Sequence, residues 1–327
     1  MGGSIDSGGA GSVAGTELLV AGAAGQANTE PQTLELSGDI TNIHDPQVIE
    51  AQGRYYLYST GEGILVHTSD DLHAWTSAGQ VFATKPSWVT TTDPKDPNLF
   101  WAPEVSFFGG KYHLFYAASS FGSQNSCIGH ATRAELGTGP GWVDSGKPVI
   151  CSSAANNYNA IDPHAFLDEP GNVWLAFGSF WSGIKLIALD ANGARLDTVV
   201  TSLATRANTA VEAPYIVYHG GFYYLFESVD ACCKGAASTY KIMVGRSIDV
   251  HGPYVDQTDT TLSTGGGTLV LQGEGRWRGP GHNAILSTQG KDYNIYHSYD
   301  ADNAGIPTLR ISELSWAQNG WPISAGP

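Results

Sequence analysis

Three acidic residues and one histidine stand at matching places in a short pattern that recurs along the chain: Asp45, Asp162, Glu212 and His282. Two carboxyl groups on either side of a glycosidic bond are the minimal apparatus for sugar hydrolysis, because one protonates the leaving oxygen while the other activates water or attacks directly. A third carboxylate nearby can orient the acid or raise its pKa by like-charge repulsion. These residue types therefore indicate acid–base chemistry, provided that the fold brings them together.

The recurring pattern consists of a small polar start, a short apolar run, a turn containing glycine and an aromatic-rich strand. Its five copies, of which the last is the weakest, are led by Asp45, Ala102, Asp162, Ala213 and Asn283. The turn glycines lie 50 to 69 residues apart, too far for ankyrin or tetratricopeptide repeats, and this period suits four-stranded propeller blades. We therefore predict an all-β, five-bladed β-propeller that forms one domain over residues 39–327, behind a flexible Gly/Ala/Ser-rich leader of residues 1–38.

Each copy of the pattern predicts the hairpin formed by the first two strands of a blade. Apolar segments that follow four of the copies predict later strands of those blades, at residues 64–69, 128–132, 184–189 and 242–247. The innermost strand of every blade borders the central channel of a propeller, so equivalent positions of different blades meet near its axis.

Aligning the copies on their proline position shows which side chains should meet. The residues just before that position are Asp45, Ala102, Asp162, Ala213 and His282, and those one step earlier are His44, Trp101, Ile161, Glu212 and Gly281. An Asp-Pro pair also begins ordinary turns, which would account for Asp45 and Asp162 one at a time. It does not account for Glu212, which occupies the place of Trp101. The alignment thus favours three carboxylates and a histidine at one mouth of the channel.

Several segments carry a family resemblance: His44–Pro46, Trp101–Glu104, Asn159–Pro163, Gly178–Gly183, Val211–Tyr215 and Gly281–Asn283. In this order they resemble the arabinanases of glycoside hydrolase family 43. The resemblance implies an inverting enzyme that cleaves α-1,5-linked L-arabinofuranose chains, with Asp45 as general base, Glu212 as general acid and Asp162 as the group that tunes and orients the acid. Inversion requires room for a water, so the carboxyl groups of Asp45 and Glu212 are expected roughly 6.5 to 9.5 Å apart.

The same resemblance implies further contacts. Trp101 and Phe121 would be sugar platforms, while Asn159 and Ser179 would hydrogen-bond the arabinose. Additional candidates for the wall of the groove are Tyr215, Trp181 and Arg310. The resemblance also places a metal, usually calcium with mostly water ligands, beside His282. A lone imidazole is a poor calcium ligand, so without the resemblance His282 is a structural histidine.

Two other classes of function stay open. One is an exo-acting α-L-arabinofuranosidase or a β-xylosidase on the same fold. The other is a propeller that binds carbohydrate without turnover, which would repeat its polar residues in every blade. The asymmetric distribution of Asp, Trp, Glu and His among the copies favours a single axial site instead.

The amino-acid composition limits the kinds of partner that the chain can bind. The net charge is −15, with only 16 Lys and Arg among 327 residues, so the chain lacks the basic surface that nucleic acid requires. Its 35 aromatic residues suit a neutral polysaccharide such as arabinan or an arabino-oligosaccharide. No run of about 18 apolar residues predicts a membrane span. We expect a monomer that acts outside the cell, although no signal peptide is visible in the chain.

The four cysteines are Cys127, Cys151, Cys232 and Cys233, an even number that is compatible with an oxidising compartment. Their spacing is not that of a zinc site. Neighbouring Cα atoms are about 3.8 Å apart, so Cys232 and Cys233 either form a vicinal ring or stay as two thiols. Such a ring would lie close behind the blade that carries Glu212 and could shape one end of the groove. The state of Cys127 and Cys151 is left open.

Overall fold

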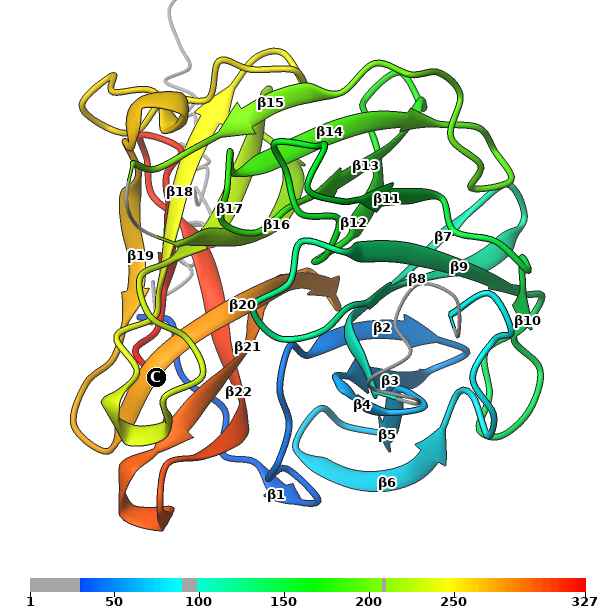
Figure 1. The fold of residues 1–327 in the computed structure, drawn as a ribbon. Helices are drawn as coiled ribbons and strands as arrows, with labels where there is room; N and C mark the ends of the chain where they lie inside the picture. The colour runs from blue at the N-terminus through cyan, green and yellow to red at the C-terminus, as the bar shows by residue number, and fades with distance from the viewer. Residues whose placement is uncertain (1–29, 90–98, 208–209) are drawn as a thin grey trace, which may run out of the picture. The chain divides into compact units, whose positions relative to one another are not determined.

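The computed structural model describes residues 30–89, 99–207 and 210–327, and from Pro31 onward these form five antiparallel sheets, one for each copy of the sequence pattern (Figure 1). The prediction of an all-β, five-bladed propeller is confirmed. Three 3₁₀ turns lie among the described residues: η1 (Gly235–Ala237), η2 (Leu262–Thr264) and η3 (Ala301–Asn303). None of the described helices has the length and apolar character needed to cross a membrane.

The strands of the first blade are β2 (Gln47–Ala51), β3 (Arg54–Ser59), β5 (Leu65–Ser69) and β6 (Ala74–Gln80). Those of the second are β7 (Leu99–Phe108), β8 (Lys111–Ala118), β9 (Ser126–Arg133), β10 (Val143–Asp144) and β11 (Ile150–Ser152), to which β4 (Gly61–Glu62) adds. The third consists of β12 (His164–Leu167), β13 (Val173–Phe177), β14 (Ile184–Leu189) and β15 (Thr201–Ala204). The fourth consists of β16 (Val211–His219), β17 (Phe222–Val229), β18 (Lys241–Ser247) and β19 (Thr268–Gln272). The fifth consists of β20 (Trp277–Thr288), β21 (Lys291–Asp300), β22 (Ile306–Trp316) and β23 (Pro322–Ser324).

Alternation along the second strand of each blade builds the core. Successive side chains of a strand point to opposite faces, so each second strand contacts both neighbouring blades. In β3, Leu57 belongs to the apolar cluster shared with the fifth blade, and Tyr58 belongs to the cluster shared with the second. One such cluster lies at each of the five boundaries between blades. The predicted hairpins and later strands are confirmed, and their aromatic residues hold blade against blade.

The N-terminal segment closes the ring. Leu34 N–H donates to the carbonyl of Ile311 in β22 at 2.8 Å, and the carbonyl of Ile40 accepts from Leu309 N–H at 2.8 Å. Within the same segment, β1 (Ser37–Gly38) pairs in parallel with β6 of the first blade. Residues 32–38, assigned above to the leader, are therefore hydrogen-bonded to the propeller. Residues 1–29 lie outside those that the structure describes.

Both cysteine pairs form disulfides. Cys127 in β9 is bonded to Cys151 in β11, opposite it in the second blade. Cys232 and Cys233 form the vicinal ring, one of the two alternatives that the sequence left open. All four cysteines are thus oxidised, which suits an extracellular compartment.

Two buried histidines join the second strand of the second blade to the third. His113 Nδ1 lies 2.9 Å from His130 Nε2, and His113 Nε2 lies 3.2 Å from the carbonyl oxygen of Phe108. Burial lowers the pKa of each imidazole from 6.5 to about 4. Because the pKa values are depressed in the folded state, the stability that the pair contributes is present above pH 6.5 and is lost as the pH falls toward 4.

We predict that replacing both histidines by Gln will make the midpoint of thermal unfolding less sensitive to pH between 6.5 and 4. The matched control is His73→Gln, which removes an exposed histidine from the first blade. Calorimetry of the two variants and the parent across this range measures the slopes. Equal slopes for the double variant and the parent would show that protonation of the buried pair does not contribute to acid unfolding.

Candidate active site

The inner strands begin with a shared backbone distortion. At the position before the aligned proline, five residues that are not glycine adopt left-handed φ angles between 44° and 55°: Asp45, Ala102, Asp162, Ala213 and His282. Residues before proline normally avoid this conformation, and left-handed backbone costs an L-residue roughly 1 to 3 kcal/mol. The register slips there in the second, fourth and fifth blades, as at a β-bulge. The bulge redirects the side chains before and after it. Side chains from inner strands that are far apart in the sequence therefore point to one place.

Side chains of the preceding blade accept the amide hydrogens of four of these distorted residues. The donor and acceptor pairs are Asp45 N with His297 Nδ1 at 3.2 Å, Ala102 N with Thr60 Oγ1 at 2.9 Å, Ala213 N with Asp162 Oδ2 at 3.1 Å and His282 N with Ser228 Oγ at 2.9 Å. A buried amide without a partner would cost about as much as a lost hydrogen bond. The distortion is therefore held in place by contacts that run around the ring.

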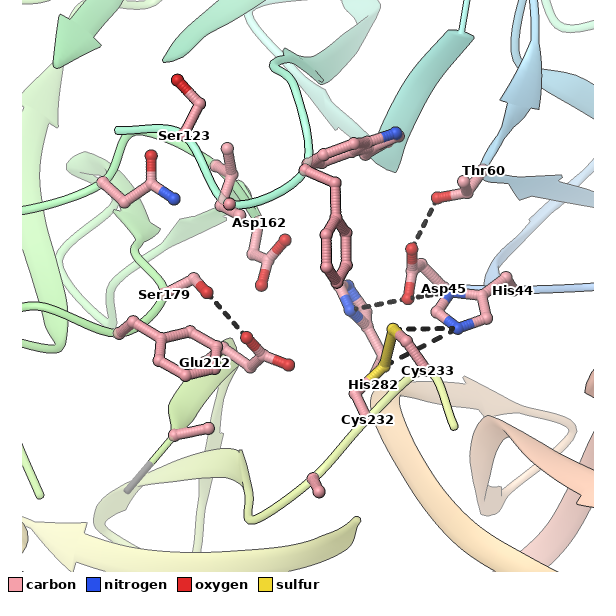
Figure 2. A pocket seen from close by; sticks show the side chains of 18 of the residues that line it. His44, Asp45, Thr60, Ser123, Asp162, Ser179, Glu212, Cys232, Cys233 and His282 are labelled. Carbon is pink, nitrogen blue, oxygen red and sulfur yellow. Dashed lines mark hydrogen bonds and ion pairs between the residues drawn. A yellow bond between two sulfur atoms is a disulfide. The ribbon is translucent and has the colours of Figure 1, made fainter. Parts of the chain in front are cut away.

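A cavity of about 1150 Å³ opens beside Asp45, Asp162 and His282. Every site residue predicted from the sequence lines it: Asp45, Trp101, Phe121, Asn159, Asp162, Ser179, Glu212 and His282. Figure 2 shows Asp45 on one side of this pocket, beside His44 and His282, and Glu212 on the other. Among the additional wall candidates, Trp181 also lines the cavity, whereas Tyr215 and Arg310 do not.

Asp45 is surrounded by hydrogen-bond donors. Its Oδ1 lies 2.8 Å from His44 Nδ1 and 3.0 Å from His282 Nδ1, and its Oδ2 accepts from Thr60 Oγ1 at 2.5 Å. Burial would raise the pKa of Asp45, but the charges and hydrogen bonds of the two imidazoles outweigh it and hold this pKa well below 3.8. The carboxyl group is thus a stable anion at neutral pH.

Glu212 has the opposite environment. Burial raises the pKa of its carboxyl group, against the effect of hydrogen bonds from the Ser179 and Tyr240 hydroxyls. The Ser179 Oγ to Glu212 Oε2 distance is 2.6 Å. Burial also raises the pKa of Asp162 to about 8, with the negative charges of Glu212 and Asp45 acting in the same direction. Glu212 and Asp162 therefore favour a shared proton, while Asp45 stays ionised.

Asp162 also holds the backbone of Glu212. Its Oδ2 accepts the amide hydrogen of Ala213, the residue that follows Glu212 in β16. A bond at this point restrains the direction in which the Glu212 side chain leaves the strand. The predicted orienting role of Asp162 thus has a physical route through the Ala213 amide.

Ser179 and Asn159 line the cavity as buried side chains. Ser179 is buried and donates to Glu212, and Asn159 is buried with its Oδ1 at 3.5 Å from Ser152 Oγ. In contrast, the Phe121 side chain is 87% exposed at the cavity, and Phe180 and Trp181 are about half exposed there. Apolar rings that face solvent in a cavity suit stacking against a ligand.

Sequence reasoning did not identify the residues that support the carboxylates. Thr60 follows the second strand of the first blade, His297 and Tyr299 lie near the end of β21, and Tyr240 precedes β18. His44 was aligned but was given no role. The second strands repeat less regularly at their ends than the inner strands do at their heads, so no template position marks these residues.

His282 is the one side chain that the sequence analysis placed beside a metal. Two groups of three possible metal ligands occur among the described residues, one formed by His44 with Cys232 and Cys233 and one by His44, Asp45 and His297. His282 belongs to neither. Its Nδ1 faces the Asp45 carboxylate, an arrangement typical of imidazoles that bind a metal through Nε2. The neighbouring Asn283 Oδ1 is buried without a partner among the described residues, and such an oxygen is a ligand type that calcium prefers.

Comparison with known proteins shows relatives over nearly the whole propeller. Residues 40–322 match the family described as Glycosyl hydrolases family 43. The chain is 43% identical over 286 residues to the extracellular endo-α-(1→5)-L-arabinanase 1 of Bacillus subtilis, covering 86% of this chain and 87% of that protein. It is 36% identical over 297 residues to the extracellular exo-α-(1→5)-L-arabinofuranosidase ArbA of Cellvibrio japonicus, covering 86% of each.

Solved structures give the same result. The endo-arabinanase of Bacillus licheniformis superposes with a TM-score of 0.84 at 42% identity, over 89% of this chain and 99% of that one. The Cellvibrio cellulosa α-L-arabinanase complexed with arabinohexaose also has a TM-score of 0.84, at 36% identity, over 88% of this chain and 96% of that one.

We predict that Gly281→Ala will destabilise the site. A Cβ at this position would lie 2.0 Å from Cδ1 of Tyr240, whose buried ring carries the hydroxyl bonded to Glu212. Overpacking of this kind typically costs about 1 to 3 kcal/mol. Urea unfolding measures the loss, and Gly326→Ala, at a position with open space for a Cβ and no left-handed φ, controls for the removal of a glycine. An unchanged free energy of unfolding for Gly281→Ala would contradict the close approach of Tyr240.

Proposed function

The chain belongs to family 43 of the glycosyl hydrolases, and from this premise we propose that it hydrolyses the α-1,5-linked L-arabinofuranosyl chains of arabinan by endo cleavage with inversion. The observation that carries the proposal is the meeting of Asp45, Asp162 and Glu212 in one cavity from three different blades. Relatives named as endo- and exo-acting arabinan enzymes support the substrate class. The 43% identity to an endo-arabinanase favours the endo mode.

Asp45 acts as the general base in this mechanism. Both imidazole donors approach Oδ1, whereas Oδ2 receives a hydrogen bond only from Thr60. A carboxylate oxygen has two lone pairs, so Oδ2 retains one for the hydrogen of the attacking water. The low pKa of Asp45 keeps the group ionised and ready to accept that hydrogen. Its negative charge also faces the positive charge that develops on the sugar ring in the transition state.

Glu212 acts as the general acid. Burial raises the pKa of its carboxyl group and so favours the protonated form, which a general acid needs to protonate the leaving glycosidic oxygen. The Ser179 and Tyr240 hydroxyls donate to this carboxyl group and set its direction. Asp162 restrains its backbone through the Ala213 amide. The inverting mechanism predicts that the separation of the Asp45 and Glu212 carboxyl groups accommodates the water.

The sugar chain would lie along the aromatic wall of the cavity. Trp101 and Phe121 offer rings for the apolar faces of arabinose units, with Trp181 extending the same wall. A relative has been solved in complex with arabinohexaose, which supports an arabino-oligosaccharide as the ligand. The relatives named as extracellular and the two disulfides support secretion.

Calcium is part of the proposal as a structural ion. His282 Nε2 is the protein atom suited to it, with water completing the shell. Burial disfavours the charged form of His282, but Asp45 and the other carboxylates raise its pKa to about 9, so an ion must compete with a proton for this ring. A bound ion would supply positive charge that holds the carboxylates together.

We predict that Glu212→Gln and Asp45→Asn will each lower kcat on debranched arabinan by about 10²-fold to 10⁴-fold, the usual contribution of a general acid or base. Glu227→Gln is the matched control: Glu227 is buried in the fourth blade outside the cavity, and its pKa of about 8 makes the neutral amide a close substitute. Chromatography of early products follows the reaction, and endo cleavage gives mixed oligomers. A single product size would refute endo cleavage, and full activity of Glu212→Gln would refute the assigned acid.

We further predict that exhaustive dialysis against a calcium chelator will lower the unfolding temperature by about 5 °C, as expected for loss of an ion held at one hundred times its Kd. Added calcium should restore the temperature and the activity. Magnesium, which demands tighter octahedral geometry, should restore less. A chelated protein with full activity and an unchanged unfolding temperature would remove calcium from the proposal.

A further inference from the structure

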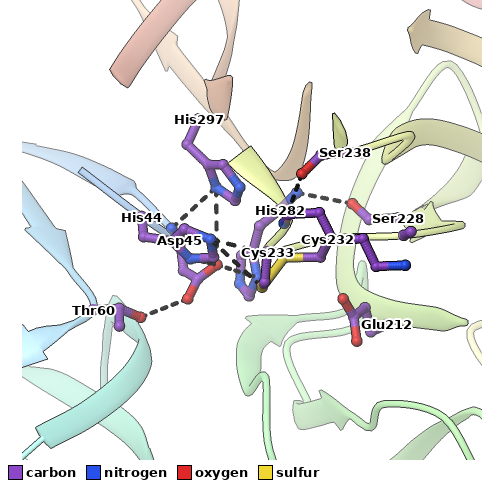
Figure 3. The surroundings of a disulfide bond; sticks show 12 residues. His44, Asp45, Thr60, Glu212, Ser228, Cys232, Cys233, Ser238, His282 and His297 are labelled. Carbon is purple, nitrogen blue, oxygen red and sulfur yellow. Dashed lines mark hydrogen bonds and ion pairs between the residues drawn. A yellow bond between two sulfur atoms is a disulfide. The ribbon is translucent and has the colours of Figure 1, made fainter. Parts of the chain in front are cut away.

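The vicinal disulfide lies behind the proposed general base, at a place that the mechanism above does not use. Figure 3 shows Cys232 and Cys233 close to His44 and Asp45. Both sulfur atoms lie 3.8 Å from His44 Nε2. The loop that carries them, residues 230–234, also lines the cavity.

Tyr299 connects this loop to His44. The Tyr299 hydroxyl is 2.8 Å from His44 Nε2, and its oxygen accepts the amide hydrogen of Cys233 at 3.0 Å. Tyr299 itself is buried in β21 of the fifth blade. One phenolic oxygen thus joins the fifth blade, the disulfide loop and the imidazole beside Asp45.

Counting hydrogens fixes the direction of the contact between Tyr299 and His44. An ionised carboxylate oxygen can only accept, so the contact of His44 Nδ1 with Asp45 Oδ1 places a hydrogen on Nδ1 and leaves Nε2 to accept. The phenolic oxygen accepts from Cys233 N–H, and its own hydrogen can join a further partner. The alternative acceptor is Cys232 Sγ at 3.4 Å, which is farther away and a weak acceptor. The hydrogen therefore points to His44 Nε2. With Nε2 as the acceptor of the phenolic hydrogen, the hydrogen of the ring stays on Nδ1, which donates it to Asp45 Oδ1.

We propose that Tyr299, held by the vicinal disulfide loop, is a positioning residue that sets the tautomer of His44 and thereby the orientation of Asp45. This inference rests on the proposed role of Asp45 as general base. A His44 with its hydrogen on Nε2 would turn a lone pair toward Asp45 Oδ1, and the two would repel. The vicinal ring contributes because a tight turn at Cys233, where φ is 65°, aims the amide hydrogen at the phenolic oxygen. Stacking of His44 on His297, with ring centroids 3.9 Å apart, keeps the ring from rotating away.

The unmodified protein gives the first test. Long-range ¹H–¹⁵N correlation spectra of protein labelled at its 10 histidines distinguish the two tautomers, and loss of one signal set in His44→Gln assigns His44. We expect His44 to carry hydrogen on Nδ1 and none on Nε2. A hydrogen on Nε2 would overturn the proposal. This test does not depend on the folding of any variant at position 299.

The second test is Tyr299→Phe, which removes only the hydroxyl. We expect kcat on arabinan to fall by about tenfold to a hundredfold, the effect of a misplaced catalytic group, while KM stays within about twofold. Tyr254→Phe is the matched control, because it removes another buried tyrosine hydroxyl, bonded to the carbonyl of Val250, away from the cavity. An unchanged kcat in a folded Tyr299→Phe variant, or a rise in KM alone, would overturn the positioning role.

The disulfide is tested by Cys232→Ala combined with Cys233→Ala, which keeps the amide but frees the turn. We expect part of the kcat loss of Tyr299→Phe and a His44 spectrum that contains both tautomers. A single unchanged Nδ1–H tautomer with full kcat would overturn the role of the ring. If Asp45→Asn is fully active, the proposed function itself fails, whereas an inactive Asp45→Asn with a normal Tyr299→Phe refutes the positioning proposal alone.

Discussion

The left-handed backbone at the head of each inner strand is the constraint on which the site depends. Asp45, Asp162 and His282 occupy this conformation themselves, and Glu212 immediately precedes Ala213, which also occupies it. An extended strand at these positions would direct alternate side chains into the boundaries between blades. The conformation is unfavourable for an L-residue before proline, so it persists only where the surroundings hold it. The acceptors supplied by His297, Thr60, Asp162 and Ser228 provide that hold.

This arrangement makes each carboxylate dependent on a neighbouring blade. Thr60 accepts from Ala102 N and donates to Asp45, so the hydroxyl that restrains the second blade also binds the proposed base. Asp162 accepts from Ala213 N and so restrains the strand of the proposed acid. Both carboxyl groups are buried, yet their pKa values move in opposite directions because Asp45 meets two imidazoles while Glu212 meets neutral hydroxyls. The choice of neighbours, more than the depth of burial, separates base from acid.

The fold and the converging residues were predictable because both are properties of the repeat. A pattern present five times reveals the blade, and aligning its copies brings Asp45, Asp162, Glu212 and His282 to one level without any knowledge of loops. Thr60, Tyr240 and Tyr299 were not predictable in this way, since they lie at strand ends and loops where the copies diverge. The hydrogen bond from the buried Ser179 hydroxyl to Glu212 was not predicted either. Hydrogen-bond direction and burial at such sites follow from tertiary packing, which no single segment encodes.

A second set of contacts around the propeller axis, next to the distorted residues, explains why the site opens at one mouth of the channel only. The residues after the aligned prolines are Gln47, Glu104, His164 and Tyr215. Gln47 Nε2 donates to Val105 O, and Glu104 lies 3.4 Å from His164 Nδ1, on whose ring Tyr215 packs at 3.9 Å. Tyr215 then donates to the carbonyl of Ile285 in the fifth blade. These side chains join all five blades around the axis, and none of them lines the cavity. These side chains occupy the channel next to the proposed catalytic carboxylates. The carboxylates therefore face one mouth of the propeller, where a long polysaccharide can approach without threading through the ring.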